Sequence, residues 1–317
     1  MSLSALKAKL LALLAGFLFV FFPWESFRSN FYNDRLNYFN YIEYYTNKID
    51  YFDYSNFISY ISYEWLWHFI IKVSHEDLGL STLFILSFLS FFSFTTNFYF
   101  LSRKLGFYSS FLLLNPIFVD FVQSQLRLAF AASLALFAMM VFRHSKLVAV
   151  LLIFSTLFIH TGIIIFYIIA LFCFFYKIKK IFLSPVMLVL FGLLVAFVTG
   201  PFLGDILAAM DDRRAGYSDM SAPIIYMIFW YILLFYIFLV LSKLKNKSYG
   251  DFYVAFGFVI LSLIFFGSFL GVYTSRFLAA AYPFVILNIF VAQKFERYII
   301  VSMYLLYTLS AWVFWLT

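Results

Sequence analysis

Long apolar runs separated by short polar segments dominate the chain, and this pattern predicts membrane-spanning helices. A helix needs about 20 apolar residues to cross the hydrocarbon core of a bilayer. Runs near that length recur along the whole chain and predict about eleven spans, within a range of 10 to 12. The predicted spans cover residues 5–22, 79–101, 106–122, 126–142, 146–160, 161–176, 183–203, 222–242, 252–273, 277–293 and 298–316. The expected fold class is therefore an all-α polytopic integral membrane protein, with residues 1–317 forming a single domain.

Two of these predicted spans have ambiguous limits. The run 106–122 is short and contains Asn115-Pro116, and the apolar region 146–176 could be divided at another point. A third stretch, 57–72 (FISYISYEWLWHFIIK), has too many polar residues for an ordinary span. Its pattern predicts an amphipathic helix that lies at the membrane interface.

The first 22 residues could form either a span or a signal peptide. Two lysines precede the apolar run, as in both kinds of segment. No Ala-x-Ala-like cleavage site follows, because Pro23, Trp24 and Glu25 come next. We therefore expect an uncleaved first span.

The distribution of charge predicts the orientation in the membrane. With the N-terminus in the cytoplasm and every span crossing, the inner segments hold 14 of the 22 basic residues and two acidic ones. The outer segments then hold eight basic and 13 acidic residues. Positive charge is enriched on the cytoplasmic side of membrane proteins, so this orientation is favoured. The calculated pI near 9.2 thus reflects topology and gives no support to nucleic-acid binding.

The composition excludes several other classes of protein. Hydrophobic residues make up 65% of the chain and charged residues 12%, with a mean hydropathy of +0.96, which no soluble domain of this length tolerates. The lone cysteine, Cys173, rules out an intrachain disulfide and a multi-cysteine metal site. No Walker, dinucleotide-binding or HExxH pattern is present, so ATP-driven and zinc chemistry have no support.

The longer hydrophilic segments predict where chemistry takes place. The inner loops are too short to hold a catalytic domain, whereas outer segments 23–78 and 204–221 are longer. The first of them is rich in tyrosine, which suits both the bilayer interface and the faces of sugars. We expect the active face to lie outside the cytoplasmic membrane.

Polar residues from distant segments converge on that outer face in this topology. Gln123 and Arg127 are four residues apart at the start of one span, and Tyr273 and Arg276 are three apart at the start of another, so each pair would share a helix face. Arginine is suited to bidentate binding of phosphate oxygens. The other candidates of this face are Arg28, Asp34, Glu64, Asp120, Gln125, His160, Asp211, Asp212, Arg213, Arg214 and Tyr217.

Each of these residues also has a simpler interpretation. An arginine at the outer edge of a span can extend to lipid headgroups, and the DDRR run can be an internally paired, solvated loop. His160 can merely bond to a neighbour, and Glu64 can be solvated on its amphipathic helix. The joint occurrence of these residues on an otherwise acidic face favours a binding site.

The motifs resemble the EpsG/Wzy-type polysaccharide polymerases of bacterial inner membranes, over most of the chain. The matching elements are Arg28, Asp34 and Tyr38 in the first loop, Tyr63-Glu64, the Asn-Pro and Gln-x-x-Arg stretch in LLNPIFVDFVQSQLRLAFAASLALFA, the Phe-His-small element in LFIHTG, Arg213 or Arg214 with Tyr217, and SRFLAAAYP. The pair QSQLR leaves open whether Gln123 or Gln125 is the functional glutamine.

The resemblance implies a glycosyltransferase of O-antigen, capsule or exopolysaccharide biosynthesis, in the inner membrane with its active face outside. Its substrates would be oligosaccharide repeat units on undecaprenyl diphosphate, as both donor and acceptor. A chain-length regulator and a flippase in the same membrane would be partners, with no cofactor and no nucleic acid.

The expected mechanism assigns a role to each candidate residue. Arginines stabilise the leaving lipid diphosphate, with Arg127 and Arg276 first, Arg213 or Arg214 from the loop, and Arg28 in addition. His160 is the first candidate for the general base, and Glu64 and Asp34 are the next. Gln123, Gln125, Tyr217 and Tyr273 would support the site. We expect no metal, although Asp211-Asp212 could hold Mg²⁺ or Mn²⁺.

Other functions remain open at this point. A glycan ligase would use the same lipid-linked donor, and sequence does not separate it from a polymerase. A transporter or flippase for lipid-linked glycans would place charges deep in the membrane and contain internal repeats, neither of which is found in the sequence. An O-acyltransferase would need a nucleophile or a pair of histidines, and only His160 is well placed for chemistry. A structural subunit would not need the clustered outer arginines.

Overall fold

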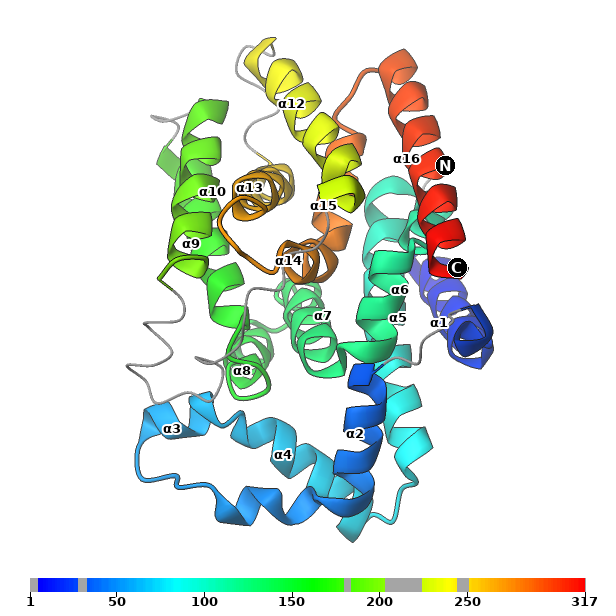
Figure 1. The fold of residues 1–317 in the computed structure, drawn as a ribbon, viewed down its shortest axis with the longest axis vertical. Coiled ribbons are helices and arrows are strands. Elements are labelled where there is room, and N and C mark those ends of the chain that lie inside the picture. Colours follow the sequence, from blue (N-terminus) through cyan, green and yellow to red (C-terminus); the bar gives the residue numbers. More distant parts are fainter. Residues whose placement is uncertain (1–4, 28–32, 180–183, 203–223, 244–250, 317) are drawn as a thin grey trace. The chain divides into compact units, whose positions relative to one another are not determined.

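The computed structural model describes residues 5–27, 33–179, 184–202, 224–243 and 251–316, and in these ranges it contains helices and no β-strand (Figure 1). The expected all-α class is therefore confirmed for this part of the chain. The α-helices are α1 (Ala5–Phe21), α2 (Asn33–Tyr44), α3 (Phe57–Ser62), α4 (Trp65–Lys72), α5 (Thr82–Leu105), α6 (Pro116–Ser124), α7 (Leu126–Val141), α8 (Lys146–Thr156), α9 (Ile163–Lys179), α10 (Pro185–Thr199), α12 (Ile228–Lys243), α13 (Phe252–Gly267), α14 (Thr274–Ala280), α15 (Tyr282–Ile289) and α16 (Lys294–Leu316). The 3-10 and π turns are η1 (Trp24–Phe27), η2 (Thr46–Tyr51), η3 (Val73–Asp77), η4 (Phe107–Leu113) and η6 (Ile224–Met227).

The number of long apolar helices is smaller than the sequence pattern predicts. In the described ranges, α5 and α16 are long and apolar enough to cross a membrane, and the bent pair α6–α7 would be a third if it forms one span. The expectation of about eleven such spans is therefore wrong. Most of the predicted runs do contain helices, but these have 11 to 17 residues, as in α8 and α9. At 1.5 Å per residue they are shorter than the roughly 30 Å hydrocarbon core.

Proline and its neighbours explain where two predicted spans are interrupted. The run 106–122 divides into η4 and α6 because Pro116 starts a helix, with the Asn115 side chain accepting a hydrogen bond from the Ile117 amide at 3.0 Å. The run 277–293 divides at Ala281 into α14 and α15, and Pro283 lies in the first turn of α15. An apolar run of adequate length thus need not form one continuous helix.

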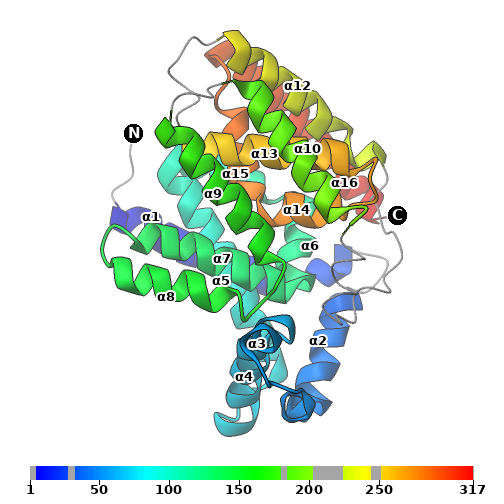
Figure 2. The same ribbon diagram turned by 90° about the vertical axis from the view of Figure 1, so that its left-hand side faces the viewer.

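The described helices form two compact units, residues 1–164 with 313–317 and residues 165–312. In the first unit α1 packs on α5, α5 on α7, and α7 on α8. Gly16 allows a close approach of α1 to α5, because a Cβ there would lie 2.0 Å from Thr95 Oγ1. Both views place α2, α3 and α4 together at one end of this unit (Figure 2). The expectation of a single domain stays a prediction.

The predicted amphipathic helix over 57–72 is interrupted and partly buried. It divides at Tyr63 and Glu64 into α3 and α4, so the expectation of one helix is wrong. In α4, Trp67 and Ile71 are buried in a core that also contains Ile42 of α2 and Leu126 of α7. Because this face packs against protein, α4 belongs to the core of the first unit and holds the residues beside it in place.

The second unit is organised around α13, which packs against α10, α12, α14 and α15. Small residues bring these helices close together: a Cβ on Gly192 of α10 would lie 2.5 Å from Ser262 Cβ of α13. The buried hydroxyls of Tyr282 and Tyr304 bond to each other at 2.7 Å. Close backbone approach at small residues is typical of helix packing in membranes.

Candidate functional site

Glu64 occupies an unusual backbone position in the first unit. It separates α3 from α4 and has φ 52° and ψ 47°, the left-handed conformation that side chains other than glycine rarely adopt. Among the described residues it is the only non-glycine with positive φ. Backbone strain of this kind occurs often at functional sites, where the surrounding structure fixes a side chain in a required direction.

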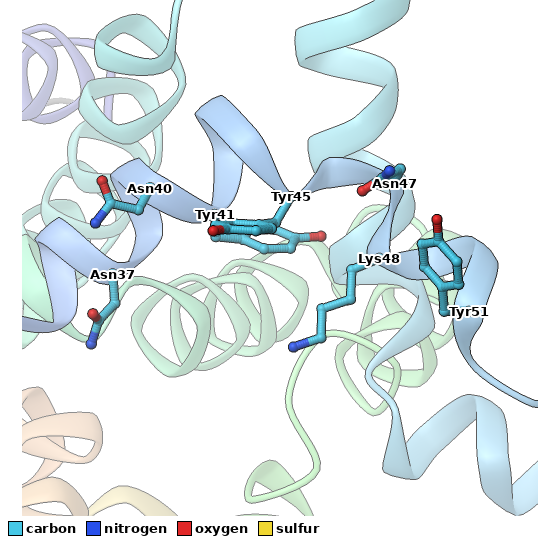
Figure 3. Close-up of a pocket in the computed structure, with 7 residues that line it drawn as sticks. All are labelled: Asn37, Asn40, Tyr41, Tyr45, Asn47, Lys48 and Tyr51. Carbon is cyan, nitrogen blue, oxygen red and sulfur yellow. The ribbon is translucent and has the colours of Figure 1, made fainter.

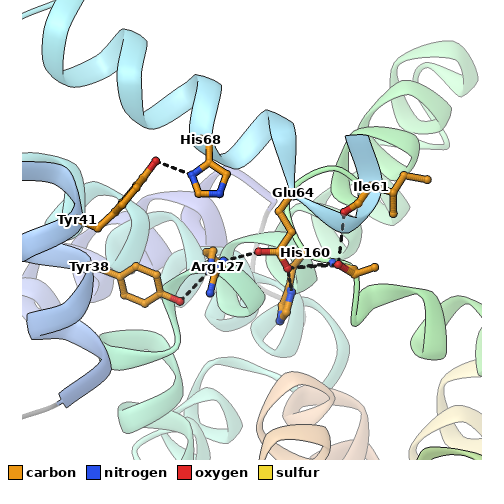
Figure 4. A network of polar contacts seen from close by, with 8 residues as sticks. Tyr38, Tyr41, Ile61, Glu64, His68, Arg127 and His160 are labelled. Atoms are coloured by element: carbon orange, nitrogen blue, oxygen red, sulfur yellow. Dashed lines mark hydrogen bonds and ion pairs between the residues drawn. The ribbon is translucent and has the colours of Figure 1, made fainter. Parts of the chain in front are cut away.

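The Glu64 carboxylate is buried and bonds to two other segments of the chain (Figure 4). Its Oε1 lies 2.6 Å from Nδ1 of His160 and 3.3 Å from the amide nitrogen of Thr161, which donates to it. Its Oε2 accepts a hydrogen bond from Nη1 of Arg127 in an ion pair. The Glu64 side chain is 6% exposed, and a buried carboxylate needs such partners to remain charged.

Arg127 lies in the first turn of α7 and is held from two sides. Its Nε donates to the Tyr38 hydroxyl at 3.1 Å, and its guanidinium carbon lies 5.6 Å from the centroid of that ring. The helix dipole disfavours a cation in a first turn, so the Glu64 carboxylate offsets this cost. Nη2 has no hydrogen bond or ion pair with any residue that the structure describes, and the side chain is 23% exposed. This nitrogen can therefore bind a ligand.

His160 lies in the turn that follows α8, and α4 holds this turn in place. The Phe158 carbonyl accepts hydrogen bonds from the amides of Leu66, at 3.0 Å, and Trp67, at 3.3 Å. These bonds fix the turn beside Glu64. The carboxylate occupies Nδ1 of His160, and Nε2 has no partner in the described part of the chain. The side chain is 20% exposed, so Nε2 can exchange a proton with a ligand.

A second histidine, His68 of α4, lies close to Glu64, and its amide donates to the Glu64 carbonyl oxygen at 3.4 Å. The Tyr41 hydroxyl lies 2.5 Å from Nδ1 of His68 (Figure 4). Burial raises the pKa of Tyr41, although the nearby Arg127 cation opposes this. Tyr41 therefore keeps its proton and can donate it to His68, which leaves the histidine proton on Nε2.

The two candidate glutamines do not share a helix face with Arg127. The chain bends by 102° between α6 and α7, at Gln125, so the expectation that Gln123 and Arg127 lie on one face is wrong. Gln123 instead accepts a hydrogen bond at its Oε1 from Arg35 of α2, at 2.6 Å. The Oε1 of Gln125 is buried and has no hydrogen-bond partner in the described structure.

The remaining candidate residues lie elsewhere or outside the described ranges. In the second unit the Arg276 guanidinium carbon lies 4.7 Å from the centroid of the Tyr273 ring, so these two residues are neighbours, as their spacing predicts. Asp34 lies in the first turn of α2, and Asp120 accepts a hydrogen bond from Ser124 at 3.1 Å. The predictions for Arg28, Asp211, Asp212, Arg213, Arg214 and Tyr217 fall outside the described residues.

The structure also contains functional neighbours that the sequence analysis missed. Tyr41 was missed, although it lies three residues after Tyr38 on α2, a spacing that could have identified a shared face. Thr161 follows His160 directly, and its hydroxyl lies 3.4 Å from Glu64 Oε1. Arg35 gave no sequence signal, because its partner Gln123 is 88 residues away in the chain.

Neither a metal site nor a known relative indicates which reaction the site could catalyse. No group of three or more His, Cys, Asp or Glu side chains in the described ranges is arranged to hold a metal ion. Searches against protein-family models, curated proteins and solved structures find no match to this chain. The network of Glu64, Arg127, His160 and Tyr38 is therefore the feature of the described structure that bears on function.

Proposed function

We propose that this chain polymerises oligosaccharide repeat units carried on undecaprenyl diphosphate, at the outer face of the bacterial inner membrane. One observation carries the proposal: a single buried carboxylate, that of Glu64, holds a histidine and an arginine together. Glycosyl transfer from a lipid diphosphate needs these two groups close to each other. A base must remove a proton from the acceptor, and a cation must stabilise the leaving diphosphate.

The proposed reaction assigns the base role to His160. With Nδ1 fixed by Glu64, Nε2 accepts the proton of the acceptor hydroxyl. The acceptor oxygen forms a bond to the anomeric carbon of the donor glycan. The bond from that carbon to the diphosphate oxygen breaks, and the electron pair leaves with the lipid diphosphate. The carboxylate stabilises the imidazolium that results.

Arg127 is the proposed ligand of the leaving diphosphate. Its Nη2 is directed away from the two bonds that fix the guanidinium through Nε and Nη1. The first turn of α7, where it lies, also has amide groups without intrahelical partners, and such a turn favours anions. Glu64 is then a positioning residue, because both of its oxygens already bond to protein. The roles expected for Arg276, Arg213, Arg214, Arg28, Tyr273 and Tyr217 stay predictions.

The proposal includes an integral membrane location. Helices α5 and α16 and the bent pair α6–α7 would cross the bilayer, and the shorter apolar helices would complete a polytopic bundle. The surface of these helices supports this, since many large apolar side chains are exposed, for example Phe88 of α5 and Leu306 of α16. In the cytoplasmic N-terminus orientation the Glu64 network faces outward.

The proposed function is tested by complementing a deletion strain and resolving its surface glycan on a gel. The variants are Arg127→Ala and His160→Ala, with Arg103→Ala in the last turn of α5 as a matched control, all at equal membrane levels. We expect a ladder of chain lengths from the wild type and the control, and a single-repeat product from the other two. A normal ladder from both site variants would show that the network does not carry the reaction.

The same strains separate the alternative functions by product. Lipid-linked repeats trapped on the cytoplasmic side in the deletion strain would indicate a transporter. Long glycan that accumulates on the lipid carrier, without transfer to its final acceptor, would indicate a ligase. Either result would replace the proposed polymerase.

A further inference from the structure

A pocket of about 690 Å³ lies between α2 and η2 in the first unit (Figure 3). We call it the α2–η2 pocket. Asn37, Asn40 and Tyr41 line it from α2, and their spacing of three and four residues places them on one helix face. Tyr45 continues this face at the end of α2. The pocket is large enough for a ligand of two or three sugar rings, since small-molecule sites commonly measure about 300 to 1,000 Å³.

The lining of the pocket combines amide groups with exposed aromatic rings. Asn47 and Tyr51 of η2 complete a set of three asparagines and three tyrosines. Each asparagine amide offers both donors and an acceptor, which match the neighbouring hydroxyls of a sugar. The ring of Tyr45 is 59% exposed and that of Tyr51 79% exposed, so both are accessible to the apolar face of a sugar ring.

Lys48 gives the pocket a positive charge. It is the charged residue among the side chains that line the pocket, and it has no ion-pair partner among the described residues. Nearby Lys72, in contrast, pairs with Asp50 at 2.7 Å. An uncompensated ammonium beside hydrogen-bonding amides favours a ligand that carries an anionic group.

We infer that the α2–η2 pocket binds a short oligosaccharide in which one sugar carries an acidic group, a carboxylate or a phosphate, beside Lys48. The inference depends on the proposed function only for which glycan enters, namely part of the repeat unit on the lipid. The pocket and the Glu64 network share α2, since Tyr38 of this helix contacts Arg127 and Tyr41 lines the pocket. A glycan bound in the pocket would thus contact the helix that also holds Tyr38 against Arg127.

The tyrosines of the pocket have a competing explanation in the bilayer interface, where such rings are enriched. Headgroup binding would account for the rings and for Lys48. It would not account for the three asparagines, because water at the interface already forms hydrogen bonds with their amides. The combination of amides and rings therefore favours a sugar over a lipid headgroup.

The test measures glycan binding by the full chain in lipid nanodiscs. The probe is a set of oligosaccharides released by mild acid from the host's own surface polysaccharide, titrated by saturation-transfer NMR. We expect Tyr45→Ala to raise the Kd by about fivefold or more, as expected for the loss of one ring contact. Tyr298→Ala in α16 is the matched control, because Tyr298 is an exposed tyrosine that does not line the pocket. Its Kd should change by less than about twofold.

Lys48→Gln tests the charge of the ligand. It should weaken binding of the acidic fragments and leave binding unchanged for the same fragments after their acidic group is reduced or removed. A host glycan without any acidic sugar would overturn this part of the inference. Equal Kd values for Tyr45→Ala and Tyr298→Ala, or no binding by the wild type, would overturn the pocket as a glycan site. So would a Tyr45→Ala variant that loses retention in the membrane but keeps glycan affinity.

Binding and polymerisation fail separately in these experiments. If the pocket variants bind as the wild type does while His160→Ala abolishes the ladder, the pocket is wrong and the proposed function stands. If Arg127→Ala and His160→Ala keep the ladder while Tyr45→Ala loses glycan affinity, the function is wrong and the pocket stands.

Discussion

Glu64 and His160 are 96 residues apart in the chain, yet Oε1 of the glutamate lies 2.6 Å from Nδ1 of the histidine. This contact occupies Nδ1 and leaves Nε2 as the ring nitrogen without a partner in the described part of the chain. The other carboxylate oxygen binds Arg127, so the position of the imidazole and the position of the guanidinium depend on one side chain. The consequences for stability can be measured without any assay of activity.

The first prediction concerns the coupling between Glu64 and Arg127. Glu64→Gln and Arg127→Gln should each lower the free energy of unfolding by about 2–4 kcal/mol, because each leaves a largely buried charge without its partner. The double variant should lose less than the sum of the two by about 1–3 kcal/mol. Unfolding in mixed detergent micelles measures all three. Additive losses would show that the ion pair contributes no coupling.

The exposed ion pair of Lys72 and Asp50 is a matched control for the Glu64 and Arg127 variants. Nζ of Lys72 lies 2.7 Å from Oδ2 of Asp50, but the Asp50 side chain is 59% exposed. Water and salt screen such pairs, so Lys72→Gln should leave the stability nearly unchanged.

The second prediction isolates the backbone strain at Glu64. Glu64→Gly and Glu64→Ala both remove the carboxylate, but only glycine adopts a φ of 52° without steric cost. The glycine variant should therefore be more stable than the alanine variant by about 1 kcal/mol. Thermal unfolding of the two purified variants gives this difference. If alanine is equal or better, the backbone relaxes and the left-handed conformation is not under constraint.

The third prediction distinguishes the two glutamines beside the α6–α7 bend. Gln125→Met should be neutral or stabilising by up to about 1 kcal/mol, because the buried Oε1 of Gln125 has no partner to lose. Gln123→Met removes the side-chain acceptor of Arg35, while the bond from Arg35 to the Gln123 main-chain carbonyl at 3.1 Å can persist, and it should cost about 1–3 kcal/mol. Chemical unfolding of each variant provides the comparison. The reverse order of stabilities would contradict the described hydrogen bonds.

The fourth prediction concerns the contact between α1 and α5. A valine at Gly16 would place its Cβ 2.0 Å from Thr95 Oγ1, and the ring of Phe91 blocks a sideways shift. Gly16→Val should therefore cost about 1–3 kcal/mol by overpacking. Folded yield in the membrane and thermal midpoint should both fall. Leu14→Val is the control on the same helix, since Leu14 is 55% exposed, and it should have little effect.

The fifth prediction is a loss of stability at alkaline pH. Burial raises the pKa of Tyr54 to about 12, and the charges of Tyr60 and Asp50 add to the shift. Between pH 10 and 12 the unfolded chain loses this proton while the folded chain keeps it, so stability falls as pH rises. Thermal midpoints over this range, with tyrosinate absorbance, measure the effect. Tyr54→Phe should reduce the slope without lowering stability at pH 7, because the Tyr54 hydroxyl has no described partner.

The sequence pattern predicted the class of fold and the positions of most helices, but not their continuity. Hydrophobicity is a property of a run of residues, whereas a break depends on a few local angles. Asn115-Pro116 was visible as a possible interruption, and the structure divides the chain there. The turn at Gln125 gave no such signal, because no proline or glycine marks it.

The same limitation applies to the candidate site. Residue type and charge singled out Glu64, Arg127 and His160 from three separate segments. An ionisable residue beside apolar runs is costly, so it indicates a partner or a function. Their mutual contact could not be derived, because it depends on the break between α3 and α4 and on the turn after α8. Arg35 and Thr161 were missed because each acts through a partner that is distant in the chain.

The left-handed residue at position 64 also has a consequence for the order of synthesis. Glu64 leaves the ribosome 63 residues before Arg127 and 96 residues before His160. Until both have followed, the nascent chain contains an acidic side chain whose final neighbours do not yet exist. That carboxylate must stay hydrated or protonated until these later segments have been synthesised. The contacts of Glu64 are therefore completed late in synthesis, and a chain truncated before the turn after α8 would contain the carboxylate without its histidine partner.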